Sequence, residues 1–145
     1  MNFKERCISL LDEGRMFEDS GHRTRFKELL DCYGDYPFFS GGLCKCMYLS
    51  AWDEVHFAVM LEVLTEMALG KERDTREMRM QGEILAGECA GGEYYVFRLS
   101  NAFLDGKEFL LEEDARMEPE YEYIIRRALQ AGALIERALC QAGSP

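Results

Sequence analysis

Positive charge is scarce in this sequence. It contains 17 lysines and arginines against 27 aspartates and glutamates, which gives a formal net charge of −10 at pH 7. Nucleic-acid binding needs cationic groups that displace phosphate counterions, and anionic membrane surfaces attract basic segments. Two local exceptions are the group Arg23, Arg25 and Lys27 and the mixed-charge run at residues 71–79. We therefore expect neither nucleic acid nor a membrane as a partner, and no salt-dependent retention on DNA.

Long uncharged apolar runs are also missing. A membrane-spanning helix needs about 20 mostly apolar residues in a row. The first residues, MNFKERCISLLDEG, carry charges within their first turns and contain no long apolar segment. This pattern predicts neither a signal peptide nor a membrane anchor, and it indicates a cytoplasmic protein.

The signatures of common nucleotide, protease and hydrolase sites are absent as well. No G-x-x-x-x-G-K-[ST], G-x-G-x-x-G, H-E-x-x-H or G-x-S-x-G occurs. The acidic run Glu112, Glu113 and Asp114 lacks the spacing of an EF-hand loop, so a solvated surface is the better interpretation. We expect no cofactor, and these absences favour a protein that is not an enzyme.

Cysteine, by contrast, occurs six times. An even number raises the question of a disulfide framework, which small secreted proteins use when their core is too small. A chain of 145 residues can build its own core, and several of these cysteines fall on predicted apolar helix faces. Reduced, buried thiols are therefore expected. The cysteines are Cys7, Cys32, Cys44, Cys46, Cys89 and Cys140.

The longest dense run of large apolar residues extends over residues 38–70. Within it, Ser50 and Asp53 have the spacing of a capping box, so a helix is predicted to begin at Ala51. Apolar side chains cover more than half of the circumference of this helix, and Gly70 suits its C-terminal end. A helix that is apolar nearly all round must be covered by neighbours. Residues 51–69 are therefore predicted to be the buried central helix.

Helical periodicity extends over most of the remaining chain. Apolar residues recur at helical spacing in residues 2–18, 20–33, 43–49 and 119–141. Residues 93–111 fit either a helix that ends near Asp105 and Gly106 or a β-hairpin around that pair, and the helix is preferred. The prediction is an all-α fold: one compact domain, residues 1–145, with about six to seven helices around helix 51–69. The alternative is an α+β fold with a hairpin near 93–111.

Aromatic side chains next to the predicted central helix provide one candidate site. They either belong to the core or form a surface that receives a protein partner, because aromatic anchors dominate binding energetics. His56 lies on the apolar face of the same helix, and Asp53 is assigned to the helix cap rather than to His56. The histidine is interpreted as a neutral core residue with one hydrogen-bond partner, or as a ligand or general base in a dry pocket. The aromatic residues are Phe38, Phe39, Tyr48 and Trp52.

One cluster in the sequence contains residue types that bind metals. It consists of Cys44-Lys45-Cys46, with Cys32 upstream and His56 downstream. Thiolate and imidazole groups suit tetrahedral zinc. A C-x-C pair inside a helix, however, directs its two thiols about 200° apart. A metal site is therefore not expected, and buried thiols are the better interpretation. A Cys-His catalytic dyad with His56 remains the enzymatic alternative.

Two stretches, HRTRFKELL at residues 22–30 and FRLSNAFLDG at residues 97–106, carry a family resemblance. Together they resemble motifs of small uncharacterised bacterial proteins, some of which are carried by phage and other mobile elements. The resemblance covers about a third of the chain. It implies a helical structure around Tyr94 and a bacterial or phage origin, and it carries over no activity and no site residues.

The preferred functional hypothesis is a non-enzymatic intracellular module that binds another protein or regulates it. Its partner would be a basic protein or a second copy of the chain. The alternative is a small thiol- or metal-dependent enzyme centred on Cys44, Cys46 and His56. Stoichiometric zinc or iron in the purified protein would favour the enzyme, and a metal-free protein that tolerates mutation of Cys44 would favour the binding module.

Overall fold

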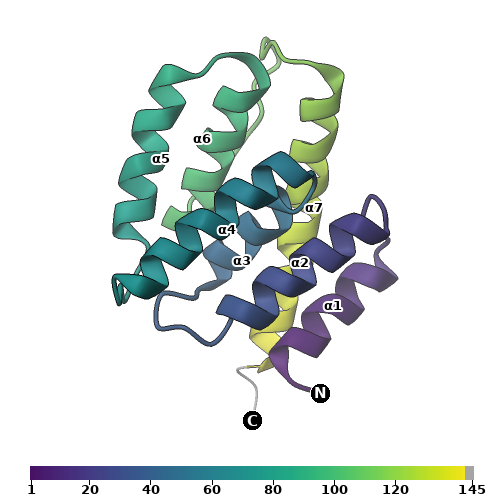
Figure 1. Cartoon of the computed structure of the whole chain (residues 1–145). Helices are drawn as coiled ribbons and strands as arrows, with labels where there is room; N and C mark the ends of the chain where they lie inside the picture. Colours follow the sequence, from purple (N-terminus) through teal and green to yellow (C-terminus); the bar gives the residue numbers. More distant parts are fainter. Residues whose placement is uncertain (143–145) are drawn as a thin grey trace.

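The computed structural model of the chain describes residues 1–142 and contains seven α-helices in that range (Figure 1). The predicted all-α class is confirmed, and the region of the alternative hairpin is mostly helical. Residues 143–145, which the predicted domain includes, lie outside the described range. The helices are α1 (Phe3–Glu13), α2 (Ser20–Tyr33), α3 (Gly41–Ser50), α4 (Glu54–Leu69), α5 (Arg76–Glu88), α6 (Gly91–Asp105) and α7 (Pro119–Ala142).

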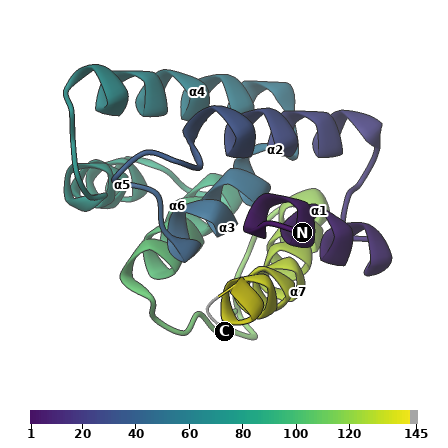
Figure 2. The same cartoon turned by 90° about the horizontal axis from the view of Figure 1, so that it is seen from below.

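Helix α3 lies at the centre of the fold. Ser40 caps it, because its hydroxyl accepts a hydrogen bond from the Leu43 backbone N–H at 3.1 Å. The helix contacts α2, α4, α6 and α7, and Figure 2 shows it in the middle of the molecule. With neighbours on several sides, most of its residues are inaccessible to solvent. The buried residues are Leu43, Cys44, Cys46, Met47, Tyr48 and Leu49.

The prediction that residues 51–69 form the central buried helix is wrong. α4 lies at the edge of the molecule beside α2, and its main contacts are with α2 and α3 (Figure 2). A single stripe of Met60, Leu64 and Met67 is buried, whereas Val55 and Val59 are largely exposed. Apolar side chains do cover more than half of the circumference of α4, as predicted, but neighbouring helices cover only part of this apolar surface. Local composition does not determine how many helices pack around a segment.

The start of α4 also differs from the prediction. Ser50 is the last residue of α3, and its hydroxyl donates to the Met47 carbonyl at 3.2 Å. The N-cap of α4 is Asp53, whose carboxylate accepts from the His56 backbone N–H at 2.7 Å. The chain turns between the two helices, so α4 begins at Glu54 rather than at Ala51.

The C-terminal helix α7 closes the core on the side away from α4. It contacts α1, α3 and α6, and Figure 1 shows it running along the length of the molecule. Among the helices of residues 1–142, none has both the length and the apolar character that a membrane crossing requires. The buried side chains of α7 are Ile124, Ile125, Ala128, Ala131, Ile135 and Ala138.

His22 of α2 is fully buried, although sequence reasoning assigned it no role. Its Nδ1 accepts from the Glu18 backbone N–H at 3.2 Å, so Nε2 carries the proton and donates to the Tyr48 carbonyl at 2.9 Å. Burial lowers the pKa of His22, because the charged ring would lose its hydration. The neutral core histidine expected at position 56 is therefore found at position 22.

His22 should make the protein less stable in mild acid. Its pKa is lower in the folded than in the unfolded chain, so the unfolded chain binds the extra proton as the pH falls below about 6.5. The free energy of unfolding should then decrease with falling pH, with a slope of at most about 1.4 kcal/mol per pH unit from this residue. Urea denaturation at pH 8 and pH 5 measures the difference. We expect a smaller difference in the free energy of unfolding between the two pH values in the His22→Gln variant. An equal difference would contradict the conclusion that His22 causes the loss of stability in acid.

Candidate functional site

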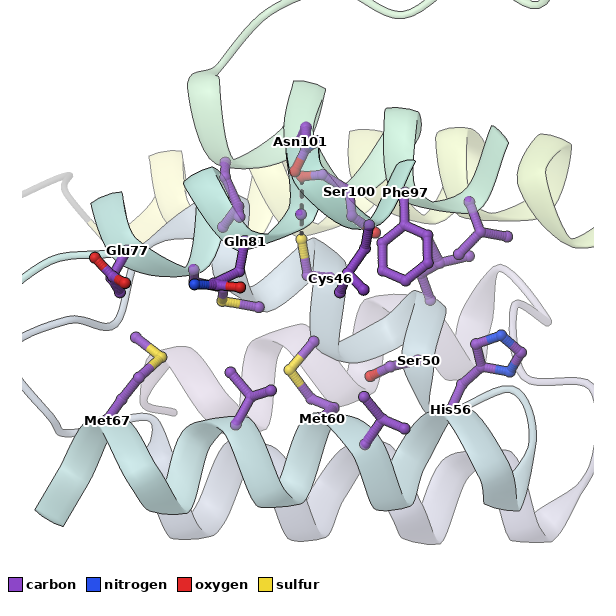
Figure 3. A pocket seen from close by; sticks show the side chains of 18 of the residues that line it. Cys46, Ser50, His56, Met60, Met67, Glu77, Gln81, Phe97, Ser100 and Asn101 are labelled. Atoms are coloured by element: carbon purple, nitrogen blue, oxygen red, sulfur yellow. Dashed lines mark hydrogen bonds between the residues drawn. The ribbon is translucent and has the colours of Figure 1, made fainter. Parts of the chain in front are cut away.

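A groove of about 760 Å³ opens between α4 and α5 (Figure 3). We call it the α4–α5 groove. α4 and α5 form its two walls, and residues of α3 and α6 form its floor. It exists because α5 packs mainly on α6, while α4 packs mainly on α2 and α3. The two walls therefore stand apart above a shared floor.

The walls and floor of the α4–α5 groove are mostly apolar. Val55, Val59 and Val63 follow one another at intervals of four residues along α4, so they share one face of that helix. This face lies next to the buried stripe and explains the excess of apolar residues that predicted a central helix. The opposite wall and the floor add further apolar side chains, which are Met78 and Leu85 of α5 and Val96, Phe97 and Leu104 of α6.

Two side-chain amides interrupt this apolar lining near its middle. Gln81 of α5 and Asn101 of α6 have no side-chain hydrogen bond to any residue in the described range, so their polar atoms are available to a ligand. Cys46 of α3 belongs to the floor and donates from Sγ to the Ser100 carbonyl at 3.4 Å (Figure 3). Burial raises the pKa of Cys46 to about 12, so the group remains a thiol and is a poor nucleophile.

Four glutamates and one histidine are part of the groove lining. Glu66, Glu72 and Glu77 lie towards the C-terminal end of α4, and Glu93 lies towards its N-terminal end, beside His56. No lysine or arginine is part of the lining. The groove therefore combines an apolar surface with a negative potential, which attracts cationic groups.

The N-terminal end of the groove is closed by a group of side chains that we call the His56 cluster. Nδ1 of His56 lies 2.7 Å from Oδ1 of Asp53, and Nε2 lies 2.8 Å from Oε1 of Glu93. Both partners are carboxylate oxygens, which accept hydrogen bonds, so each contact engages one of the two ring nitrogens. The Trp52 ring packs on the imidazole with centroids 4.9 Å apart. The Tyr121 hydroxyl donates to the same Glu93 oxygen at 2.5 Å, and this bond raises the pKa of Tyr121.

The His56 cluster corrects two sequence-based interpretations. His56 is partly buried and contacts two carboxylates, rather than being a core residue with one hydrogen-bond partner. Asp53 caps α4 and also contacts the imidazole, whereas the two roles were treated as alternatives. Because both ring nitrogens are engaged, His56 has no free nitrogen with which to bind a metal or accept a substrate proton.

The four aromatic residues predicted as a partner surface do not form one surface. Phe38 and Tyr48 are buried, and the Tyr48 hydroxyl donates to the Met16 carbonyl. Phe39 packs on the ring of Phe3 with centroids 5.9 Å apart. Trp52 belongs to the His56 cluster, where it also meets Tyr121. Their large apolar rings were drawn into separate parts of the core, and none of them lines the α4–α5 groove.

The residues of the alternative metal or thiol site are not brought together either. Cys46 faces Ser100 of α6, whereas Cys44 faces Cys7 of α1; that thiol contact, together with burial, raises the pKa of Cys44 well above its ordinary value. Cys32 is exposed on α2. Within residues 1–142, no three histidine, cysteine or acidic side chains are grouped as metal ligands would be. The expected burial of the thiols is found at Cys7, Cys44 and Cys46 only, because Cys89 is partly exposed and Cys32 and Cys140 are exposed.

The α4–α5 groove can take up an apolar surface, offer amide hydrogen bonds at mid-length and attract positive charge. Sequence reasoning missed it because its apolar side chains were assigned to the core. A search of family models, curated proteins and solved structures found no match to this chain.

Proposed function

We propose that this protein is a binding module that takes an amphipathic, basic helix of a partner protein into the α4–α5 groove. The observation that carries the proposal is the lining itself, which is apolar on both walls and contains carboxylates without any lysine or arginine. An apolar helix face lying in such a groove is a recurring mode of peptide recognition. The proposal keeps the class preferred from the sequence, a non-enzymatic protein-binding module, and specifies the chemistry of its partner.

The elongated shape of the groove favours a helix over a compact ligand. The lining on α4 extends from Val55 to Met67, and at about 1.5 Å per residue this distance is about 18 Å. A helix of about three turns has the same length and presents apolar side chains at the same spacing. The exposed parts of Val55 and Val59 would be covered, and each Å² of apolar surface removed from water contributes about 25 cal/mol.

Charge favours a basic partner over a second copy of this chain. The groove lining is acidic, and the whole chain has a formal net charge of −10. Two such molecules repel one another, whereas a helix with lysines or arginines beside its apolar face is attracted. The partner is therefore a different protein with a basic amphipathic segment.

Binding of a synthetic peptide tests the proposed function. The probe is a peptide of about 14 residues with leucines on one helical face and lysines on the other. Titration calorimetry should show saturable binding with one site per chain. A peptide of the same composition, scrambled so that it has no apolar face, should bind at least about tenfold more weakly. Absence of binding, or equal binding of both peptides, would overturn the proposal.

A matched pair of variants locates the binding site. Val59 lines the groove and is 53% exposed, whereas Ile84 lies outside the lining on α5 and is 56% exposed. Val59→Lys should weaken peptide binding by about tenfold or more, because it removes apolar surface and repels the lysines. Ile84→Lys should bind as the unmodified protein does. Equal losses in both variants would contradict the groove, and a dimer that only Val59→Lys dissociates would identify a second copy as the occupant.

A further inference from the structure

The charges of the α4–α5 groove are unevenly distributed between its two ends. At the end near the N-terminus of α4, Glu93 has two side-chain partners, because its Oε1 lies 2.8 Å from Nε2 of His56 and accepts a hydrogen bond from Tyr121. At the other end, Glu66, Glu72 and Glu77 form no ion pair with any residue of the described chain. The groove thus has one end where the carboxylate has side-chain partners and one end where the three carboxylates have no ion-pair partner among the described residues.

Glu66, Glu72 and Glu77 belong to the same end of the groove as Met67. Glu66 precedes Met67 in the last turns of α4, and the Glu72 backbone N–H donates to the Met67 carbonyl at 3.1 Å. Glu77, in the first turn of α5, lies at the same end of the groove as Met67, while His56 lies at the opposite end (Figure 3).

The basic residues of the same connection do not neutralise this end of the groove. Arg76, next to Glu77, is paired with Asp74 at 3.1 Å. Lys71 and Arg73 are exposed and are not part of the lining.

We infer that the helix bound in the α4–α5 groove carries its basic residues at one end, above Glu66, Glu72 and Glu77, with its apolar remainder directed towards the His56 cluster. This inference rests on the proposed function and adds the polarity of the partner segment. Two physical effects support it. Each lysine or arginine placed above the three glutamates gains an ionic partner that has no competing ion pair among residues 1–142. A cation placed beside Glu93 instead competes with His56 and Tyr121 for the same oxygen.

The dipole of the bound helix determines which of its two ends should carry the basic residues. The first turn of a helix carries a partial positive charge from its unpaired backbone N–H groups. When this first turn lies above the three glutamates, its partial positive charge adds to the attraction between the glutamates and the lysines. The favoured partner segment therefore has its basic residues in its first turns, followed by two turns of apolar residues at helical spacing.

A charge-removing variant tests the inference. The probe is a peptide of about 14 residues with three lysines in its first turn and a leucine face along the rest. The triple variant Glu66→Gln, Glu72→Gln, Glu77→Gln should bind it about tenfold more weakly than the unmodified protein, with a smaller dependence on salt. The control triple variant Glu112→Gln, Glu113→Gln, Asp114→Asn removes the same charge from residues outside the lining and should change the affinity less than about twofold.

The orientation of the peptide is read by attaching a nitroxide label at its lysine-bearing end. Methyl signals of Met67 and Met78 in the unmodified protein should broaden, and those of Val55 should remain sharp. Broadening at Val55, or equal affinities of the two triple variants, would overturn the polarity while leaving binding in the groove intact. Absence of binding to any protein form would overturn the proposed function and this inference with it.

Discussion

Replacing Gly42 with alanine is expected to lower the free energy of unfolding by about 3 kcal/mol and the melting temperature by roughly 10 °C. Gly42 lies in the first turn of α3, against the last turn of α6. A Cβ atom at this position would lie 2.2 Å from the Phe103 carbonyl oxygen and 3.1 Å from Cα of Leu104. Both are backbone atoms that cannot rotate away. The two helices would have to separate, and α6 carries part of the floor of the α4–α5 groove.

Gly87→Ala is the matched control for this substitution. Gly87 also lies in a helix, α5, but beyond its chain neighbours and the backbone of its own helix no atom lies within 4 Å of its Cβ position. Alanine there should raise the free energy of unfolding by about 0.5–1 kcal/mol, because it has the higher helix propensity. Urea and thermal denaturation followed by circular dichroism would compare the two variants. A Gly42→Ala variant as stable as Gly87→Ala would show that α3 and α6 do not approach this closely.

Helix existence was predictable from the sequence because local signals agree with one another. Pro119 begins α7 and is followed by Glu120 and Glu122 in the first turn, where the helix dipole favours carboxylates. Gly34 and Gly70 end α2 and α4 at the predicted positions. Gly106 ends α6 with φ of +66°, a conformation that glycine adopts without a steric penalty. These signals act within a few residues, so one sequence suffices to read them.

How deeply each helix is buried was not predictable from such local signals. α3 and α4 are both strongly apolar, and the longer α4 was chosen as the centre because it offered more apolar residues. Burial depends on which helices pack around a segment, and that depends on contacts between residues far apart in the chain. Met47 and Val59 illustrate the point, because both are apolar helix residues and yet the first is buried while the second is half exposed.

The candidate site could be predicted only in part for the same reason. His56 was singled out from sequence and does border the α4–α5 groove, but its partner Glu93 lies 37 residues further along the chain. For the large aromatic rings the sequence left core and partner surface as alternatives, and the structure packs them in the core or against it. A usable signal was the Val55, Val59 and Val63 series, which adds a second apolar stripe to a helix whose buried stripe is already complete with Met60, Leu64 and Met67.

Replacing Met47 with alanine is expected to lower the free energy of unfolding by about 2–5 kcal/mol, because it leaves a cavity in the centre of the fold. Met47 of α3 is 0% exposed, whereas Met60 of α4 is 8% exposed and borders the groove. Met60→Ala should lower the free energy of unfolding by a smaller amount, since solvent and neighbouring side chains can enter the space that the removed atoms leave. Met80 of α5 is 54% exposed, so Met80→Ala should change stability by no more than about 0.5 kcal/mol.

The three methionine variants together decide which helix is central, because the side chain removed is the same in each. Chemical denaturation gives the free energy of unfolding, and an unchanged dependence on denaturant concentration shows that the same surface is exposed on unfolding. The expected order of destabilisation is Met47→Ala, then Met60→Ala, then Met80→Ala. A Met60→Ala variant that loses more stability than Met47→Ala would place α4 in the centre after all. The valines of α4 would then be core residues, and the α4–α5 groove would not be available to a partner.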